Sequence, residues 1–167
     1  MSLTCQDLMI TPEEQLLLHP SSPIDRAFKQ MLHHGMRYLP VVEKDGTYVG
    51  VFTSPTLIKL MLPRAMTIQM GGRNPNKGLN DLNFLTMDDE DFYTALDSVK
   101  DEPVKNYLSN PKNIPVAAPD TPIMEGILLL HKYKRHVILV NPDNNQFVGV
   151  LSINSAMKKI FDEDYRA

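Results

Sequence analysis

The sequence has little cysteine, no long apolar run and no excess of basic residues, and each scarcity excludes a class of protein. Its single thiol, Cys5, cannot form an internal disulfide, so we expect a protein of the reducing cytoplasm. Apolar runs such as LLL at 16–18 and GILLL at 126–130 fall far short of the roughly 20 residues that cross a bilayer. The N-terminus also lacks the features of a secretion signal. We therefore expect no membrane anchor.

The charge balance is slightly acidic, with 17 basic and 20 acidic residues and a net charge of −3. No basic stripe is present, so binding to nucleic acid is not expected. With 167 residues, 43% of them hydrophobic and 22% charged, the chain can bury a core. The composition fits one ordinary globular domain or two very small ones.

What the chain does contain is an internal repeat. The stretch YLPVVEKDGTYVGVFT at 38–53 has a counterpart, VILVNPDNNQFVGVLS, at 137–152. The glycines of the two Val-Gly-Val triplets, Gly50 and Gly149, set an offset of 99 positions, 149 − 50. The same offset aligns more than fifty positions without a gap. A glycine inside a strand usually marks the close approach of another backbone or of a ligand.

A short amphipathic helix precedes each predicted hairpin. In the first copy Ser22 is a candidate cap, Pro23 suits the first helical position, and Gly35 suits the helix end. In the second copy Thr121, Pro122 and Glu125 have the spacing of a capping box. The shared punctuation predicts the same helix twice.

Strands and a second helix complete each copy. The stretches at 16–20 and 115–119 end in proline and are predicted to be strands. Asp45-Gly46 predicts a two-residue turn with positive φ, and NPDNNQ supplies Asn and Asp for the left-handed region in the second copy. Second helices are predicted from Ser54 and from Asn154. The unit is β-α-β-β-α, about 57 residues long.

The fold predicted from these units is α/β (α+β), with two repeats packed in pseudo-two-fold symmetry. We divide the chain into a first repeat at 1–62, a linker at 63–104 and a second repeat with a short acidic tail at 105–167. The linker opens with a Gly-, Asn- and Pro-rich loop, and Thr86 can then cap a helix over 87–100.

This arrangement resembles the CBS (cystathionine β-synthase) domain family, whose domains occur as tandem pairs. The likeness is carried by HHGMRYLPVVEKDGTYVGVFT at 33–53 and by PVAAPDTPIMEGILLLHKYKRHVILVNPDNNQFVGVLS at 115–152, and it extends over 6–62 and 105–161. The resemblance implies two clefts that bind adenosine-bearing ligands such as AMP, ADP, ATP or S-adenosylmethionine. It also implies a homodimer through the helices, no required cofactor, and regulation in place of catalysis.

The family's ligand motif is glycine, two hydrophobics, Thr or Ser, any two residues, then Asp. Its counterparts here are GVFTSPT at 50–56 and GVLSINS at 149–155. The hydroxyls of Thr53 and Ser152 match the phosphate-binding position. Thr56 and Ser155 occupy the position of the Asp, and neither offers the two-oxygen acceptor that holds a ribose diol.

Charge and base contacts follow from the same resemblance. Arg37 stands three positions before the strand proline, where nucleotide-binding members present a cation, and Arg135 with His136 takes that place in the second copy. Backbone around the two Val-Gly-Val glycines is expected to line the clefts. Leu17 and Val116, on the first strands, are expected to contact a base.

Simpler interpretations stand beside these. Arg37 can be an ordinary surface residue, and Thr53 and Ser152 can simply cap the helices that follow. The histidines lack metal-ligand spacing, so no metal site is expected.

Three functions are therefore weighed. One is a sensor of an adenine nucleotide or another anion, and a second is a ligand-free interaction module that dimerises and docks on an unidentified effector protein. The third, an enzyme, has no catalytic constellation in its favour.

Overall fold

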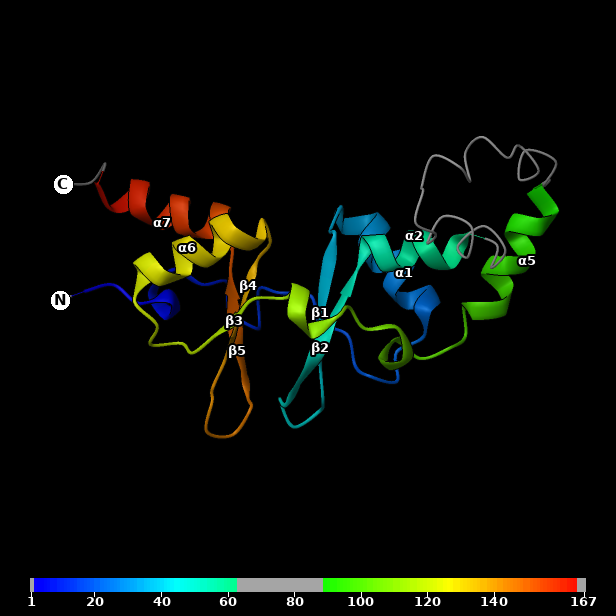
Figure 1. Cartoon of the computed structure of the whole chain (residues 1–167), viewed down its shortest axis with the longest axis horizontal. Coiled ribbons are helices and arrows are strands. Elements are labelled where there is room, and N and C mark those ends of the chain that lie inside the picture. The colour runs from blue at the N-terminus through cyan, green and yellow to red at the C-terminus, as the bar shows by residue number, and fades with distance from the viewer. Residues whose placement is uncertain (1, 63–88, 165–167) are drawn as a thin grey trace. The chain divides into compact units, whose positions relative to one another are not determined.

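The computed structural model describes residues 2–62 and 89–164. Each copy contains its predicted helices and hairpin (Figure 1). The first copy consists of α1 (Ile24–His34), β1 (Tyr38–Val42), β2 (Tyr48–Thr53) and α2 (Ser54–Met61). The second consists of β3 (Val116–Ala117), α6 (Ile123–Tyr133), β4 (Val137–Val140), β5 (Phe147–Leu151) and α7 (Ile153–Asp164). The linker contains α5 (Asp89–Val99). The short 3-10 helix η1 (Cys5–Leu8) lies at the start of the first copy, and η3 (Val104–Tyr107) and η4 (Pro111–Asn113) lie at the start of the second. The predicted mixed fold of two repeats is confirmed.

The sheets differ in how completely their first strand forms. In the second copy β3 pairs in parallel with β4, which pairs antiparallel with β5. In the first copy β1 pairs with β2, and the strand predicted at 16–20 is reduced to a single parallel bridge between Leu18 and Val41. Leu18 still makes both backbone bonds, donating to the Pro40 carbonyl at 2.9 Å and accepting from Val42 N–H at 2.8 Å.

The helix starts differ from the prediction in a consistent way. Pro23 and Pro122 are extended residues at the N-cap, one position before the first helical turn, and neither helix has a side-chain cap. The predicted caps at Ser22 and Thr121 are therefore wrong. The physical reason is that the chain at these two residues is held outside the helix. The backbone carbonyl of each accepts a hydrogen bond from a segment distant in sequence.

Each of these distant segments lies at the start of the opposite copy. Cys5 N–H donates to the Thr121 carbonyl at 2.9 Å, and Ile123 N–H donates to the Leu3 carbonyl at 3.0 Å. The equivalent bonds, shifted by 99 positions, run from Val104 N–H to the Ser22 carbonyl at 2.8 Å and from Ile24 N–H to the Glu102 carbonyl at 2.9 Å. The residues at the start of one copy thus bind the first helix of the other.

The helix ends agree with the repeat. Gly35 ends α1 at φ 61, as predicted, and Lys134 ends α6 in the same left-handed conformation at φ 55. Both caps donate their backbone N–H four residues back, to Met31 and to Leu130. A lysine can therefore fill the position at which the first copy uses glycine, at a cost in backbone strain.

The hairpin turns also keep one left-handed residue each. Gly46 has φ 92 and Asn145 has φ 58. The first turn is not the two-residue turn that was predicted, because Gly46 N–H donates to the Glu43 carbonyl at 3.0 Å and closes a four-residue turn. Asp45 stays outside the left-handed region and accepts from Thr47 N–H at 3.0 Å.

These two turns bind each other reciprocally. Tyr48 N–H donates to the Asn145 carbonyl, and Phe147 N–H donates to the Gly46 carbonyl, both at 2.9 Å. Each bond becomes the other when the copies are exchanged by 99 positions. The contact therefore has the predicted pseudo-two-fold symmetry.

The chain divides into two compact units that do not follow the repeats. One comprises residues 1–20, 39–51 and 109–167, and the other comprises 21–38 and 52–108. In the first unit α6 and α7 lie on the same side of sheet β3–β4–β5 (Figure 1). Their core is formed by buried residues of η1, α6, the sheet and α7: Cys5, Leu8, Leu130, Val137, Leu139, Leu151 and Ala156.

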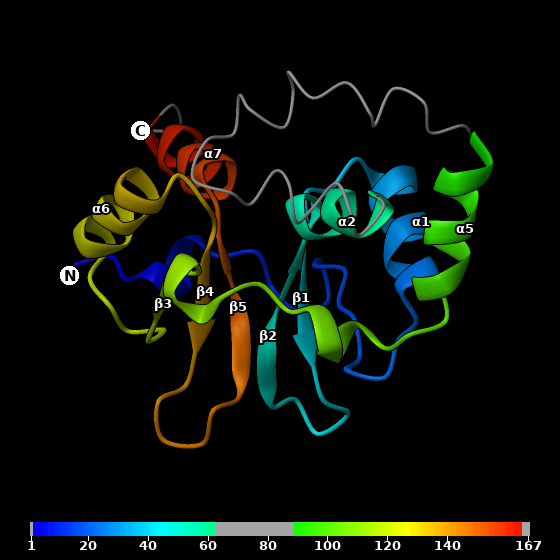
Figure 2. The ribbon, with the colours of Figure 1, turned by 45° about the vertical axis from the view of Figure 1, so that its right-hand side comes forward.

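In the second unit α1, α2 and α5 lie next to one another (Figure 2), and α2 contacts α5. The predicted linker helix is confirmed as α5 over its described part. Its proposed cap Thr86 and the predicted loop from 63 lie outside the described residues, and the proposed domain boundaries remain predictions. Within the described ranges, no helix has the length and apolarity needed to cross a membrane.

Candidate functional site

In the second copy the motif hydroxyls are tied to each other at the start of α7. Ser155 N–H donates to Ser152 Oγ at 2.9 Å, and Ser152 N–H donates to Ser155 Oγ at 3.0 Å. Ser155 Oγ also donates to the Ser152 carbonyl at 3.1 Å. This is a reciprocal cap of the helix. The single hydroxyl proton of Ser155 is therefore committed within the chain.

The first copy arranges its motif differently. Thr53 occupies the N-cap position of α2 without donating or accepting a cap bond through its side chain to the helix. Its Oγ1 lies 3.3 Å from Thr56 Oγ1, and Thr53 is only 4% exposed. Two hydroxyls thus face each other at the position where the family motif combines a hydroxyl with a carboxylate.

The backbone of Arg37 lies directly beside that helix start. Its carbonyl accepts the Ser54 N–H at 2.8 Å, and Ser54 is the first residue of α2. The Arg37 side chain is exposed. The backbone of an arginine is therefore fixed at a helix N-terminus, where the helix dipole favours negative charge.

The second copy presents a different cation. His136 is half-buried, and burial lowers the pKa of its imidazole from the ordinary value of 6.5. Burial therefore disfavours the charged form of this ring. The neighbouring Arg135 is exposed and remains charged, so it is the permanent cation of this copy.

The glycine of β5 is explained by the chain itself. A Cβ at Gly149 would lie 2.6 Å from the Ile10 carbonyl oxygen and 2.6 Å from Met9 Sδ. Ile10 and Val150 exchange backbone bonds of 2.7 and 3.0 Å at this point. The close approach predicted for this glycine is therefore made by the protein's own backbone.

The structure groups the remaining predicted site residues by unit. Thr53, Thr56 and Arg37 belong to the unit of 21–38 and 52–108. All the other residues predicted to bind ligand belong to the other unit: Leu17, Gly50, Val116, Arg135, His136, Gly149, Ser152 and Ser155. Leu17 and Gly50 are half-buried, and Val116 is 48% exposed. Their role in ligand binding stays a prediction.

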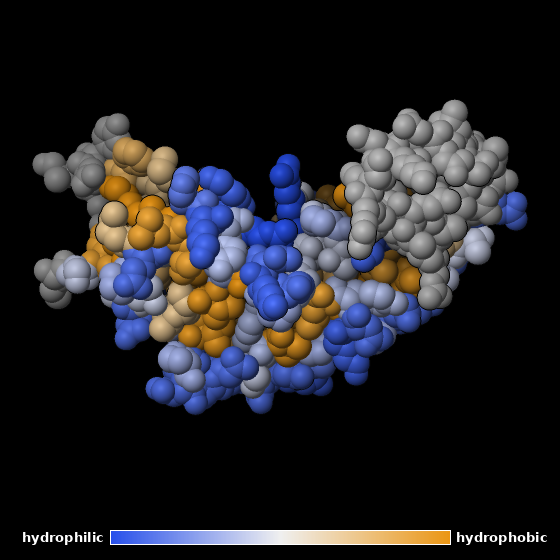
Figure 3. All heavy atoms as spheres, in the orientation of Figure 1, coloured by the Kyte–Doolittle hydropathy of each residue, from blue (hydrophilic) through white to orange (hydrophobic). Residues whose placement is uncertain are grey.

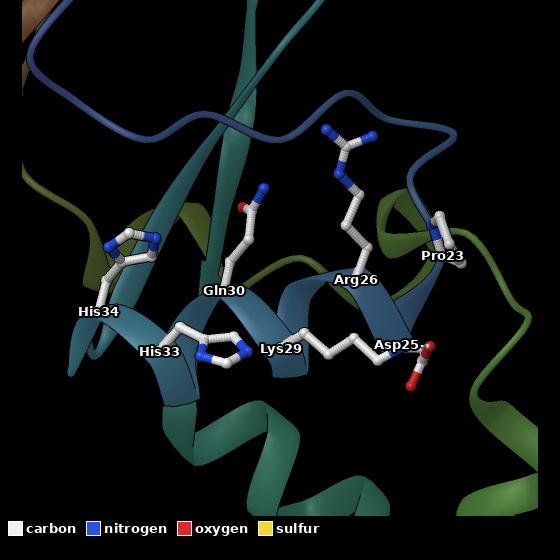
Figure 4. A pocket seen from close by; sticks show the side chains of 7 residues that line it. All are labelled: Pro23, Asp25, Arg26, Lys29, Gln30, His33 and His34. Atoms are coloured by element: carbon white, nitrogen blue, oxygen red, sulfur yellow. Dashed lines mark ion pairs between the residues drawn. The ribbon is translucent and has the colours of Figure 1, made fainter.

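Two surfaces were not recognised from the sequence. One is a hollow of about 420 Å³ along α1, described below (Figure 4). The other is an apolar face on α6 and α7, where Figure 3 shows hydrophobic residues gathered at the surface. Its members are 37–65% exposed: Met124, Ile127, Leu128, Ile153, Met157 and Phe161. The signal for this face was the i, i+4 spacing of large apolar residues on both helices.

Comparisons with known proteins agree with this architecture. The family model of the CBS domain matches residues 5–63 and 104–162. No curated protein sequence matches significantly.

Among solved structures, the CBS-pair protein CBSX2 from Arabidopsis thaliana is similar, with 16% identity, complete coverage of both chains and a TM-score of 0.69. CBSX2 in complex with AMP gives 18% identity over 96% of this chain and 98% of that chain, with a TM-score of 0.65. CbpB in complex with c-di-AMP gives 11% identity over 99% and 91%, with a TM-score of 0.63.

Proposed function

Since the chain belongs to the CBS domain family and carries two copies of that domain, we propose that it is a non-catalytic regulatory module that binds an adenine nucleotide or a related anion. The observation that carries the proposal is the hydrogen bond from Ser54 N–H to the Arg37 carbonyl at 2.8 Å. It fixes the backbone of Arg37, whose side chain is exposed, beside the N-terminus of α2, and a guanidinium and a helix N-terminus both favour a phosphate group. CBSX2, a similar CBS-pair protein, has been crystallised with AMP, and CbpB with c-di-AMP.

The proposed ligand is held more by its anionic group than by its ribose. The Ser155 hydroxyl already donates a hydrogen bond to the Ser152 carbonyl, and the Thr56 hydroxyl faces that of Thr53. Neither residue offers the paired carboxylate oxygens that accept two hydrogen bonds from a vicinal diol. The second copy provides Arg135 as its charged group, with Ser152 at the helix start and Val116 exposed on β3.

The direct test is calorimetric titration of nucleotide-stripped protein with AMP, ADP, ATP and S-adenosylmethionine. We expect saturable binding that is weakened by Arg37→Ala or by Arg135→Ala, depending on which copy is occupied. Lys105→Ala, which removes an exposed cation from η3, is the matched control and should bind as the wild type does. Absence of binding to all four compounds would refute the sensor.

A second titration examines the missing carboxylate. Thr56→Asp and Ser155→Asp each place an acid three residues after the motif hydroxyl, and an acid in the first turn is also favourable to the helix dipole. We expect one of these variants to bind AMP more tightly than wild type and to discriminate against 2′,3′-dideoxy-AMP. Unchanged affinity in both variants would show that the ligand site lies elsewhere.

The rival function, a ligand-free interaction module, is favoured by the apolar face of α6 and α7. Six large apolar side chains are exposed on these two helices, and a gathered apolar surface often marks a protein interaction site. We propose that this face binds a second copy of the chain.

Charge supports a symmetric pairing. Glu125 and Lys132 are exposed and lie seven residues apart on α6, so they flank the same side of the stripe formed by Met124 and Leu128. When two α6 helices pack antiparallel, Glu125 of one copy faces Lys132 of the other, and Leu128 lies near the centre. Dimer formation and nucleotide binding are measured separately, so the proposed dimer can be refuted while the proposed nucleotide binding stands, and the reverse.

A further inference from the structure

The hollow along α1 has no role in the proposed nucleotide site. Its volume is about 420 Å³, and its walls come from α1 and the residue before it: Pro23, Asp25, Arg26, Lys29, Gln30, His33 and His34 (Figure 4). Four of these seven side chains are basic or can become so, and all four are exposed. A groove on one helix is too open to enclose a small molecule, so it suits an extended partner better.

The charge of the hollow is only partly compensated. Asp25 is its single acid, and its carboxylate is 2.9 Å from Lys29 Nζ, along the helix axis in Figure 4. Among the residues that the structure describes, Arg26 forms no ion pair. The hollow therefore retains a net positive charge that an acidic group can neutralise.

An orphaned acceptor lies beside Arg26. The side-chain oxygen of Gln30, Oε1, is buried and has no hydrogen-bond partner within the described part of the chain. Gln30 is one helical turn after Arg26, and Figure 4 shows both side chains projecting from the same side of α1. A buried acceptor without a donor destabilises the fold. A bound partner that brings an N–H or O–H group to this oxygen would remove that cost.

We propose that this hollow docks an acidic peptide segment of a partner protein. Carboxylates of the segment bind Arg26 and His33, and a backbone N–H of the segment donates to Gln30 Oε1. A peptide supplies both kinds of group in one strand, whereas a simple carboxylate or a fully ionised phosphate supplies no donor for Gln30.

The second copy provides an internal control. At the positions equivalent to Arg26, Gln30 and His33 it carries Glu125, Leu129 and Lys132. The three equivalent positions of α6 thus carry an acid, an apolar residue and a lysine, with no side-chain amide. The docking chemistry belongs to α1 alone.

The test is fluorescence anisotropy of the full-length chain with a labelled, end-blocked hexaglutamate peptide at low ionic strength, where charge pairing is least screened. We expect saturable binding that Arg26→Ala weakens roughly fivefold. Gln30→Met should weaken binding and at the same time raise the Tm, because it removes the orphaned acceptor. Lys105→Ala, which removes an exposed cation from η3 outside the hollow, should leave the affinity unchanged.

Several outcomes would overturn the proposal. One is the absence of binding, and another is binding that is indifferent to both α1 variants. If inorganic phosphate alone displaces the peptide and itself loses affinity with Arg26→Ala, the hollow is a simple anion site. If Arg26→Glu instead dissociates a self-associated form in sedimentation, the occupant is a second copy of the chain.

Discussion

The first helices of the two copies occupy equivalent places in the repeat but present opposite surfaces. Lys29 on α1 corresponds to Leu128 on α6, and Asp25 corresponds to Met124. All four side chains are at least partly exposed to solvent. Both helices nonetheless have the same length and the same left-handed C-cap, so these differences on the outer face do not change the bounds of the helix.

The inner faces of the same helices differ much less. Ala27 and Gly126 are equivalent and buried, and so are Met31 and Leu130. The size of the inward residue follows its neighbour, since Gly126 lies against Cys5 whereas the equivalent of Cys5 in the other copy is Val104. The size of each side chain on the inner face therefore depends on the residue packed against it.

The largest effect is expected on dimer formation, when an apolar residue on the outer face of α6 is replaced by a charged one. Leu128→Asp places a charge at the centre of the proposed dimer contact, and in a symmetric dimer the change is made twice. We expect the dissociation constant to rise on the order of 100-fold or more, measured by sedimentation velocity. Lys29→Asp, the equivalent change on α1, should leave the association unaltered, and equal effects would contradict the comparison.

The inner faces can be compared through their smallest residues. A Cβ at Gly126 would lie 2.5 Å from Cys5 Sγ and 2.8 Å from Leu151 Cδ2. Gly126→Ala should therefore lower the free energy of unfolding by about 2 kcal/mol, measured by urea denaturation. In a Cys5→Ala background the closest atom is gone, so the same substitution should cost less. A cost independent of the background would show that Cys5 is not the cause.

The turns offer a smaller contrast between glycine and asparagine. Gly46 has φ 92, so Gly46→Ala should cost about 1–2 kcal/mol of stability in chemical denaturation. Gly46→Asn copies the residue that the second repeat uses at φ 58 and should cost less, because asparagine tolerates this region. If both substitutions cost the same, backbone strain is not the difference between the turns.

The smallest expected effect is on the pH dependence of stability. It comes from His136 in the second copy, whose equivalent in the first copy is Arg37. Burial lowers the pKa of His136, so the unfolded chain binds more protons than the folded chain once the pH falls below about 6.5. Stability present above that pH should be lost as the pH falls toward the folded pKa. Urea midpoints across this range should show a shallower loss in His136→Gln, and an unchanged profile would contradict the assignment.

Much of the candidate site followed from local pattern. Thr53 and Ser152 were expected to cap the helices that follow, and both precede a helix, but only Ser152 accepts a helix N–H through its hydroxyl. The lowered pKa of His136 and the hydrogen bond donated by the Ser155 hydroxyl could not be predicted in this way. Both depend on burial and on hydrogen-bond partners that the repeat motif does not specify.

The sequence by itself determined the duplication, the order of the main helices and hairpins, and left-handed residues at Gly35, at Gly46 and within NPDNNQ, where Asn145 takes that conformation. These features depend on backbone preferences of neighbouring residues, which a linear pattern records. Only the tertiary structure decided that the segments at the start of each copy bind the opposite first helix, and that the space beside Gly149 is filled by the backbone of Ile10. Such pairings join residues far apart in the chain, where free energy depends on what folding brings within hydrogen-bonding distance.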